Sequence, residues 1–344
     1  MPNKRIIYSC HAAGIASEGT TTHSAIFGLQ TLGCNSNFTI DSVYEIGKLP
    51  IYWNIEDVPE VEVTMEKVLD GHPLIYHHAT SGATDATLIG RSNKRCNVVI
   101  STFVDTQNAA SGTPIAQCWF SGMFVSSLNY NFDVTGRFTE SVSLVGNNKK
   151  WILNSVNTGG SPYAFVTGFT PTHGPLAAEG VNFRPHFDLV NSRLPKQIPG
   201  VNSTTGVINE TGSDGLPKLV LQRVAISASL GRENILQLGK KGPYFRFINV
   251  PVSVSCEIGI LSREGDGIEV DENDDSNTQD ETITVLTEEG TKISLGSMCR
   301  LRSASTSGAD AGQSNSNQMI TYRYETMNDL TVQHPADPTV ALRP

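Results

Sequence analysis

The chain has 344 residues, a formal net charge of −9 and six cysteines. This length is sufficient for two domains with separate cores, and the acidic balance argues against a nucleic-acid-binding protein, which needs a basic surface. No apolar run reaches membrane-spanning length and residues 1–10 lack the apolar core of a signal peptide, so we expect synthesis in a cytoplasm without membrane association.

Frequent Gly (31) and Pro (17) predict a mainly β chain with many turns. Residues 1–25 are mostly small, polar and aperiodic, which predicts an arm or loop. Residues 61–65 alternate apolar and polar side chains after Pro59, as a half-buried strand does. The segment 70–79 predicts a turn followed by a short helix.

Further along the chain, residues 116–124 and 127–134 are strand candidates. In the second of them Asn129, Asn131 and Asp133 alternate with apolar residues. Thr135 and Gly136 predict a turn, after which residues 138–144 return as the hairpin partner.

The remaining segments contain frequent breaks. Residues 152–216 have many Gly and Pro residues and no helical period, which predicts an extended insert. The acidic stretch 264–281 and the Ser-rich stretch 303–317 predict mobile loops. The expected domains are therefore 1–151 and 217–344, with the insert between them.

Two segments, 29–59 and 221–251, align without a gap at an offset of 192 residues. Chance gives roughly two identities in such a window. The same offset aligns 128–134 with 320–326, and so long a period predicts a duplicated domain. After Pro59 and Pro251, the alternation of apolar and polar residues is out of phase by one position between the two copies. This predicts a one-residue slip in one of them. The identical pairs of the first block are Leu29/Leu221, Gln30/Gln222, Gly47/Gly239, Lys48/Lys240, Tyr52/Tyr244, Val58/Val250 and Pro59/Pro251.

Candidate chemical sites are weak in this sequence. The six cysteines show no metal-ligand spacing, and Cys34, which matches Ile226, is interpreted as a small core residue with a free thiol. His72, His77 and His78 cluster without a third ligand at a suitable spacing, which favours packing over metal binding. The acidic run 265–275 lacks the EF-hand order. We expect no catalytic residues, no cofactor and no metal, and therefore no enzyme.

Three segments resemble the tail tube proteins of tailed bacteriophages: 38–48 (FTIDSVYEIGK), 53–63 (WNIEDVPEVEV) and 126–142 (SSLNYNFDVTGRFTESV). The resemblance implies two tandem β-sandwich or barrel domains, each with a short flanking helix. It also implies that sheets join between subunits into a ring around a lumen. Single-domain members look hexameric, so a fused pair implies trimeric, pseudo-hexameric rings that stack into a tube and conduct DNA during ejection.

This resemblance also implies partners and a location. The chain would lie in the virion tail, assembled in the host bacterial cytoplasm, and would contact itself and the tail sheath, tail terminator and baseplate proteins. The hairpin after residue 126 resembles the long hairpin of that fold. The residues expected at an inter-subunit hairpin are Leu128, Tyr130, Phe132, Phe138, Ile320, Tyr322 and Tyr324.

If the strands after Pro59 and Pro251 form the inner barrel, their polar sides face the lumen and make it acidic and rich in hydroxyls, which lets DNA slide without sticking. An ordinary solvated sheet face is the alternative. The expected lumen-facing residues are Glu60, Glu62, Thr64, Glu66, Ser253, Ser255 and Glu257.

Other functions remain open at this point. A tube-initiating or baseplate protein with the same fold is a close variant. A receptor- or carbohydrate-binding β protein is a second class, suggested by Trp53, Trp119 and Trp151. Trp53 aligns with Phe245, however, which favours a shared core position.

Overall fold

The computed structural model describes residues 6–20, 22–103, 113–153, 189, 192–208, 219–240, 242–261, 279–307 and 319–334. It confirms a mainly β chain. Most of the expected insert and most of the two expected mobile loops lie outside the described residues. Ser303–Ser307, however, which we expected in a loop, belong to a strand.

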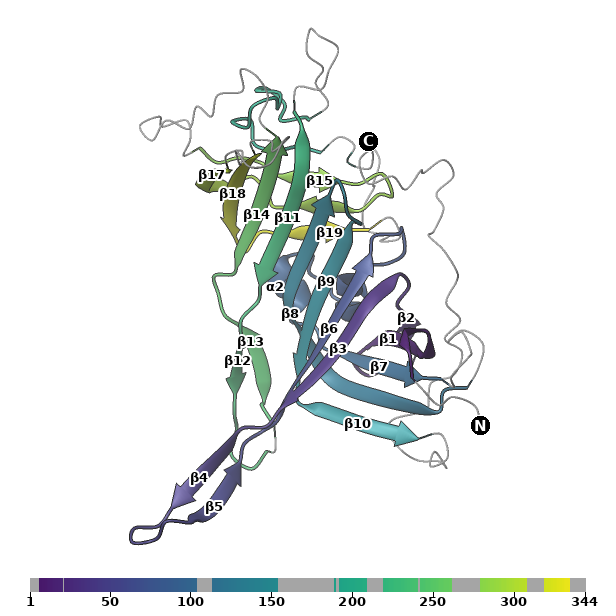
Figure 1. Ribbon diagram of the computed structural model, residues 1–344, viewed down its shortest axis with the longest axis vertical. Helices are drawn as coiled ribbons and strands as arrows, with labels where there is room; N and C mark the ends of the chain where they lie inside the picture. Colours follow the sequence, from purple (N-terminus) through teal and green to yellow (C-terminus); the bar gives the residue numbers. More distant parts are fainter. Residues whose placement is uncertain are drawn as a thin grey trace, which may run out of the picture.

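Most strands belong to one antiparallel layer, which we call the main sheet (Figure 1). Its strands alternate buried and outward side chains, as a sheet with one covered face requires. In spatial order they are β17 (Arg300–Ser307), β18 (Met319–Met327), β14 (Ser253–Leu261), β11 (Leu221–Ser229), β8 (Ala116–Asp133), β9 (Thr139–Gly146), β6 (Glu60–Val68) and β3 (Leu29–Asn37).

The long strand β8 also belongs to a second layer, the side sheet. Its first half pairs with β7 (Cys96–Thr102) and β10 (Asn148–Leu153), and β7 pairs with β1 (His11–Ser17), which pairs with β2 (Ser24–Ala25). Gly122 lies between the halves with φ of 65°, a backbone conformation that glycine adopts without strain. The two strands expected at 116–124 and 127–134 are thus one strand, and residues 11–17 form a strand where we expected an arm.

The inner face of the main sheet is covered by two short helices, α1 (Ile75–Ala79) and α2 (Leu88–Ser92), and by the small sheet β15 (Thr284–Leu286), β16 (Lys292–Ser294) and β19 (Thr331–Gln333). The helix expected at 70–79 is confirmed. A flanking helix in each half is wrong for the described residues after 219, which contain no helix. There the apolar side of the small sheet, with Val285 and Ile293, replaces it.

A buried polar network holds α1 against the main sheet. Lys67 Nζ donates to Asp70 Oδ1 at 3.1 Å and to the carbonyls of His72 and Pro73 at 3.2 and 3.1 Å. Glu140 accepts hydrogen bonds from the backbone N–H groups of Ile75 at 2.6 Å and Tyr76 at 3.1 Å, and from the hydroxyl of Tyr130 at 3.1 Å. Each buried group is satisfied, so the network can tolerate its burial.

Two hairpins leave the main sheet at equivalent positions. The first hairpin is β4 (Ile40–Tyr44) with β5 (Ile51–Glu56), and the second hairpin is β12 (Arg232–Ile235) with β13 (Phe245–Ile248). They start at residues related by the sequence offset of 192. Their tip glycines, Gly47 and Gly239, both have positive φ, 89° and 82°, which explains why this Gly occurs in both copies.

The main sheet repeats its own topology. The order β3-β6-β9-β8 corresponds to β11-β14-β18-β17. Register shifts fall at matching places: after Leu29 and after Leu221, and again after Val125 and after Leu301. The strands β6 and β14 begin at 60 and 253, so the expected one-residue slip is confirmed.

The second aligned block, 128–134 with 320–326, is not a pair of equivalent strands. It aligns β8 with β18, whereas the topology makes β17 equivalent to β8 and β18 equivalent to β9. Both β8 and β18 alternate aromatic and polar residues, so many alignments of equal parity match them. The domain boundaries proposed from the sequence remain a prediction.

Candidate functional site

The outward face of the main sheet, which we call the polar face, contains the residues expected to line a lumen. Val61, Val63 and Met65 are buried, while the residues between them on β6 point outward. On β14, Val254 and Cys256 are buried in the same way. All seven predicted residues therefore share this one face: Glu60, Glu62, Thr64, Glu66, Ser253, Ser255 and Glu257.

The side chains of this face also contact one another. Ser255 and Ser227 hydroxyls lie 2.7 Å apart across β14 and β11, and Ser253 donates to Glu325. Glu60 differs from the rest, because its Oε1 lies 3.1 Å from Arg246 Nη1 in the second hairpin. Glu60 therefore anchors that hairpin and is not a free carboxylate.

The cations of the polar face lie beside acceptors. Arg223 is in register with Asp133 and its Nε donates to Asn131 at 3.3 Å. Arg323 is in register with Glu257 on β14. Further outward positions of the main sheet carry small uncharged groups, among them Thr31, Gly33, Asn35, Ser127, Asn129, Ser141, Ser143, Ser229 and Thr321.

The seven residues expected at an inter-subunit hairpin lie in the interior of this chain. The strands β8 and β9 form the predicted hairpin, and the side chains concerned are 0–6 % exposed. Because they pack within the chain, a contact of this hairpin with another subunit would use its outward side chains. The seven are Leu128, Tyr130, Phe132, Phe138, Ile320, Tyr322 and Tyr324.

The main sheet ends in two strands, β3 and β17, that pair on one side only in the described part of the chain. Both are exposed over most of their length. Cys34 on β3 is exposed, whereas its equivalent Ile226 on β11 is fully buried. The interpretation of Cys34 as a core residue is therefore wrong for the single chain, because β11 lies between β14 and β8, whereas β3 pairs only with β6 among the described strands.

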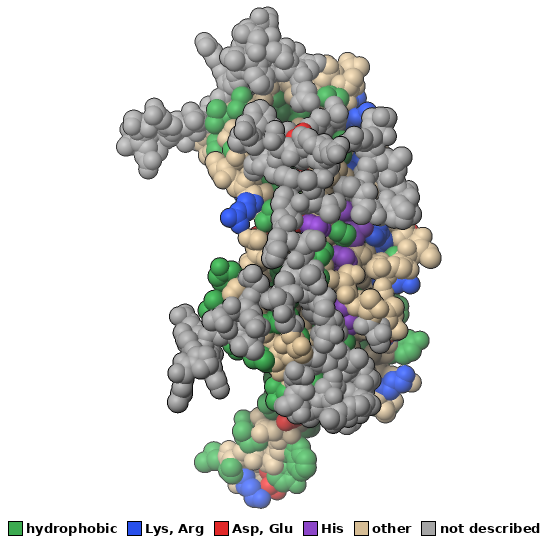
Figure 2. Space-filling model, turned by 90° about the vertical axis from the view of Figure 1, so that its right-hand side faces the viewer, with side chains coloured by type: hydrophobic (Ala, Val, Ile, Leu, Met, Phe, Trp, Pro, Cys, Tyr) green, Lys and Arg blue, Asp and Glu red, His purple; other side chains and the backbone are tan. Residues whose placement is uncertain are grey.

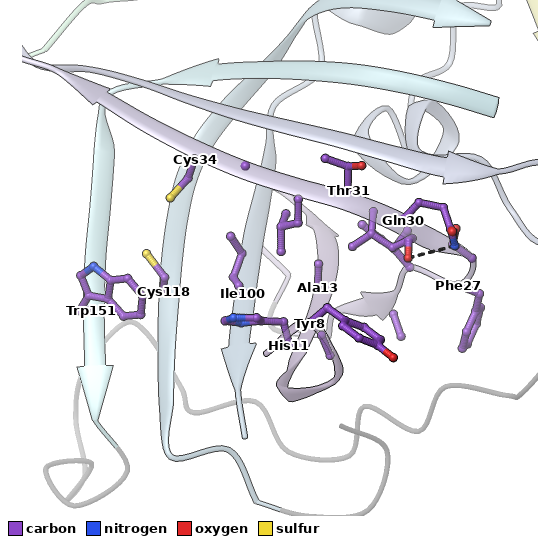
Figure 3. A pocket seen from close by; sticks show the side chains of 17 residues that line it. Tyr8, His11, Ala13, Phe27, Gln30, Thr31, Cys34, Ile100, Cys118 and Trp151 are labelled. Carbon is purple, nitrogen blue, oxygen red and sulfur yellow. Dashed lines mark hydrogen bonds between the residues drawn. The ribbon is translucent and has the colours of Figure 1, made fainter. Parts of the chain in front are cut away.

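A groove of about 610 Å³ runs along the inner side of β3. Its opposite wall is the side sheet, with Ala13, Ile100 and Trp151 (Figure 3). Cys34 and Cys118 point toward one another at one end of it. The lining is mostly apolar, so this edge of the chain presents apolar surface to whatever lies next to it.

The first hairpin is the most exposed element of the described chain. It projects from the body and is covered by apolar side chains (Figure 2). Ile46 and Leu49 at its tip are fully exposed, and Trp53 is 64 % exposed. The shared core position predicted for Trp53 and Phe245 is thus wrong, because Phe245 packs against Phe124 at 5.1 Å between ring centroids whereas Trp53 lies open.

The base of the second hairpin is held by contacts with the first half of the chain. Arg232 donates to the carbonyls of Val125 and Ser92 at 2.6–2.9 Å and lies 5.1 Å from the ring of Phe124. Arg246, 2 % exposed, bonds Gly146 and Asn147. The second hairpin is therefore fixed to the first half of the chain.

The histidines pack around α1. Burial holds the pKa of His78 and of His334 at about 4, and the Lys67 ammonium acts in the same direction. The rings of His77 and His334 have centroids 6.1 Å apart and planes tilted by 59°. Within the described ranges, no group of three or more His, Cys, Asp or Glu residues is arranged to hold a metal ion. The described helices are also too short to cross a membrane.

No family model matches this sequence, and no curated protein matches it. Solved structures similar to it include a protein of the anti-feeding prophage baseplate (9 % identity, TM-score 0.32), covering 44 % of this chain and 97 % of the other. The tube-terminating cap of the same prophage has 11 % identity and a TM-score of 0.33, with 44 % and 94 % coverage. The sheath/tube terminator of an extracellular contractile injection system has 13 % identity and a TM-score of 0.32, with 44 % and 99 % coverage. Scores this low establish no shared function.

Proposed function

We propose that this chain is a structural subunit of a bacteriophage tail tube, that three copies close a pseudo-hexameric ring, and that stacked rings conduct DNA through their lumen. One observation carries the proposal. A single chain builds a sheet from two equivalent four-stranded halves, and in its described part the strand at each end of that sheet has one edge without a neighbour.

Free sheet edges of this kind are a pairing hazard in a monomer. The two edge strands correspond to two strands that already pair with one another. In the repeat β3 is equivalent to β11 and β17 is equivalent to β8, and β11 pairs with β8 inside the chain. Pairing of β17 with β3 of a second copy repeats that junction. Such a contact is head-to-tail, and it closes a ring when the rotation is right.

The polar face suits the lumen of that ring. Its carboxylates and small hydroxyl and amide groups offer few attractive contacts to phosphates, and Arg223 and Arg323 lie beside carboxylates. DNA held by cationic contacts would have to break them at every step of passage. An acidic, weakly binding surface therefore permits rapid sliding.

Electron microscopy of the purified protein tests assembly. We expect three-fold particles with six similar lobes around a channel, and stacks of them as tubes. Chains that remain monomeric at high concentration would rule the proposal out.

A double substitution in the virion tests the lumen. Glu62→Lys with Glu66→Lys should slow DNA ejection, and this pair leaves the ion pair between Glu60 and Arg246 intact. Unchanged ejection from normal tails would remove the lumen role.

A tube-initiating or baseplate protein is the second candidate. The two hairpins differ, since the base of the second is fixed by Arg232 and Arg246 while the first is open. Two hairpins that differ in this way are as compatible with a single closed ring as with a tube of stacked rings. Purified chain that forms single closed rings, without stacks, would favour this role. In either case we propose a non-enzymatic role, with sheath, terminator and baseplate proteins as further partners.

A further inference from the structure

We infer that the first hairpin docks through Trp53 into a pocket between Met298 and Met327 of the next copy, as the second hairpin docks within the chain. This inference rests on the proposed ring and names the contact that joins its subunits. The second hairpin supplies the template, since its base is already seated on the first half of the chain.

The seat of the second hairpin is well defined. Phe245 meets Phe124 edge to face, with centroids 5.1 Å apart and planes at 77°. Arg246 donates to the carbonyl of Gly146 at 3.4 Å and to Asn147 at 3.3 Å. The acceptor surface thus includes Phe124 of β8 and the end of β9 with its following turn. Val125, Ser92 and Glu60 complete it through their contacts with Arg232 and Arg246.

The second half of the chain contains an equivalent acceptor surface, on which no hairpin of the described residues is seated. The paired registers make Arg300 equivalent to Phe124, Thr326 to Gly146 and Met327 to Asn147. These three residues line a surface pocket of about 250 Å³, together with Met298. Met298 and Met327 are 66 % and 44 % exposed, although they are large apolar groups.

The first hairpin contains the matching insert. At the offset of 192, Trp53 is equivalent to Phe245 and Asn54 to Arg246. Trp53 is 64 % exposed and Ile40, the equivalent of Arg232, is 53 % exposed. The first hairpin thus exposes the surface that the equivalent second hairpin packs against the chain.

The two surfaces have complementary chemistry. An indole ring placed where Phe245 lies would meet the Arg300 guanidinium, and cation–π contacts favour Trp with Arg. Arg300 Nε already bonds Asp280 Oδ1 at 2.6 Å, which orients the guanidinium and leaves its flat face for stacking. The two methionines add sulfur–aromatic contacts and adapt to the ring.

The same equivalences fix the strand register between copies. Inside the chain Tyr130 pairs with Ile226. Their equivalents are Thr306 on β17 and Cys34 on β3. Cys34 of one copy should therefore lie opposite Thr306 of the next, with both side chains on the inner face of the sheet.

Cysteine cross-linking tests the register and so the ring itself. Thr306→Cys, mildly oxidised, should form dimers and trimers through Cys34, and Cys34→Ser should abolish them. Ser305→Cys is the matched control, because its side chain points to the other face and should not cross-link.

Assembly measurements test the hairpin contact separately. Trp53→Ala and Met327→Asp should each raise the concentration for half-assembly by at least about 30-fold, as truncation of an aromatic hot spot does. Leu153→Ala is the control, since Leu153 is 53 % exposed on β10 and lines neither the groove along β3 nor the pocket beside Met327. In the Trp151→Phe protein, the fluorescence of Trp53 should shift to the blue on assembly.

The outcomes separate the two proposals. If Thr306→Cys cross-links but Trp53→Ala and Met327→Asp assemble as the unmutated chain does, the hairpin contact is overturned and the ring stands. If the chain stays monomeric and no cross-link forms, both are overturned. Far-UV circular dichroism of the monomers checks that each variant folds, which we expect because all substituted residues are exposed or at an edge strand.

Discussion

The buried ammonium of Lys67 should be essential to the position of α1. Its side chain is fully buried and its Nζ makes the three hydrogen bonds that an ammonium can donate. In Lys67→Met the carboxylate of Asp70 loses its cation but keeps the N–H of His72 and some solvent exposure. Removal of one partner of a buried pair costs 3–5 kcal/mol, so we expect a loss of about 3 kcal/mol, the lower end.

Urea unfolding measures this loss, and hydrogen exchange locates it. Lys67→Met should lower the free energy of unfolding and speed exchange across residues 70–79 more than in β11 or β14. Lys48→Met is the control, because Lys48 is 63 % exposed and its pair with Glu45 contributes little. A cost below about 1 kcal/mol, or an equal cost in the control, would refute the reasoning.

Three further predictions concern the stability of the folded chain. Below pH 6.5 the unfolded chain binds protons that His78 and His334 do not bind until about pH 4, so the free energy of unfolding should fall with falling pH, by up to ~1.4 kcal/mol per pH unit for each. Replacing both with Gln should flatten that slope in urea melts between pH 7 and 5. Arg246→Met should cost about 2 kcal/mol by urea unfolding and loosen the second hairpin in hydrogen exchange; unchanged exchange would contradict its anchoring role. Gly122→Val should cost at least about 1 kcal/mol, since φ there is 65°; a neutral effect would contradict the bend.

Residue alternation predicted much of the polar face. A strand with one covered face places every second side chain outward, so the outward set could be inferred from 61–65 and from 252–260 alone. The slip of one residue after Pro59 and Pro251 was visible as a change of parity. The first repeat block predicted two equivalent hairpins, and the structure places them at those residues.

Burial of edge residues could not be predicted from the repeat. Cys34 and Ile226 occupy equivalent positions, but within the described residues Cys34 has a neighbouring strand on one side, β6, whereas Ile226 lies between two, β14 and β8. Trp53 and Phe245 differ for the same reason, because Phe245 packs against Phe124 of the first half, whereas Trp53 is 64 % exposed. Equivalent sequence therefore predicts equivalent local structure, whereas exposure depends on which neighbour is present.

The repeat itself argues for contacts outside the chain. Identical residues in its two copies include Gly47 and Gly239 at the hairpin tips and the pair Tyr52 and Tyr244, which are 64 % and 61 % exposed. The turn explains the glycines, and the Lys240 ammonium lies 5.6 Å from the centre of the Tyr244 ring, but this contact leaves the tyrosine exposed. Two copies of one hairpin that retain the same exposed aromatic residue fit the proposal that each hairpin makes the same kind of contact, the first with a second copy of the chain.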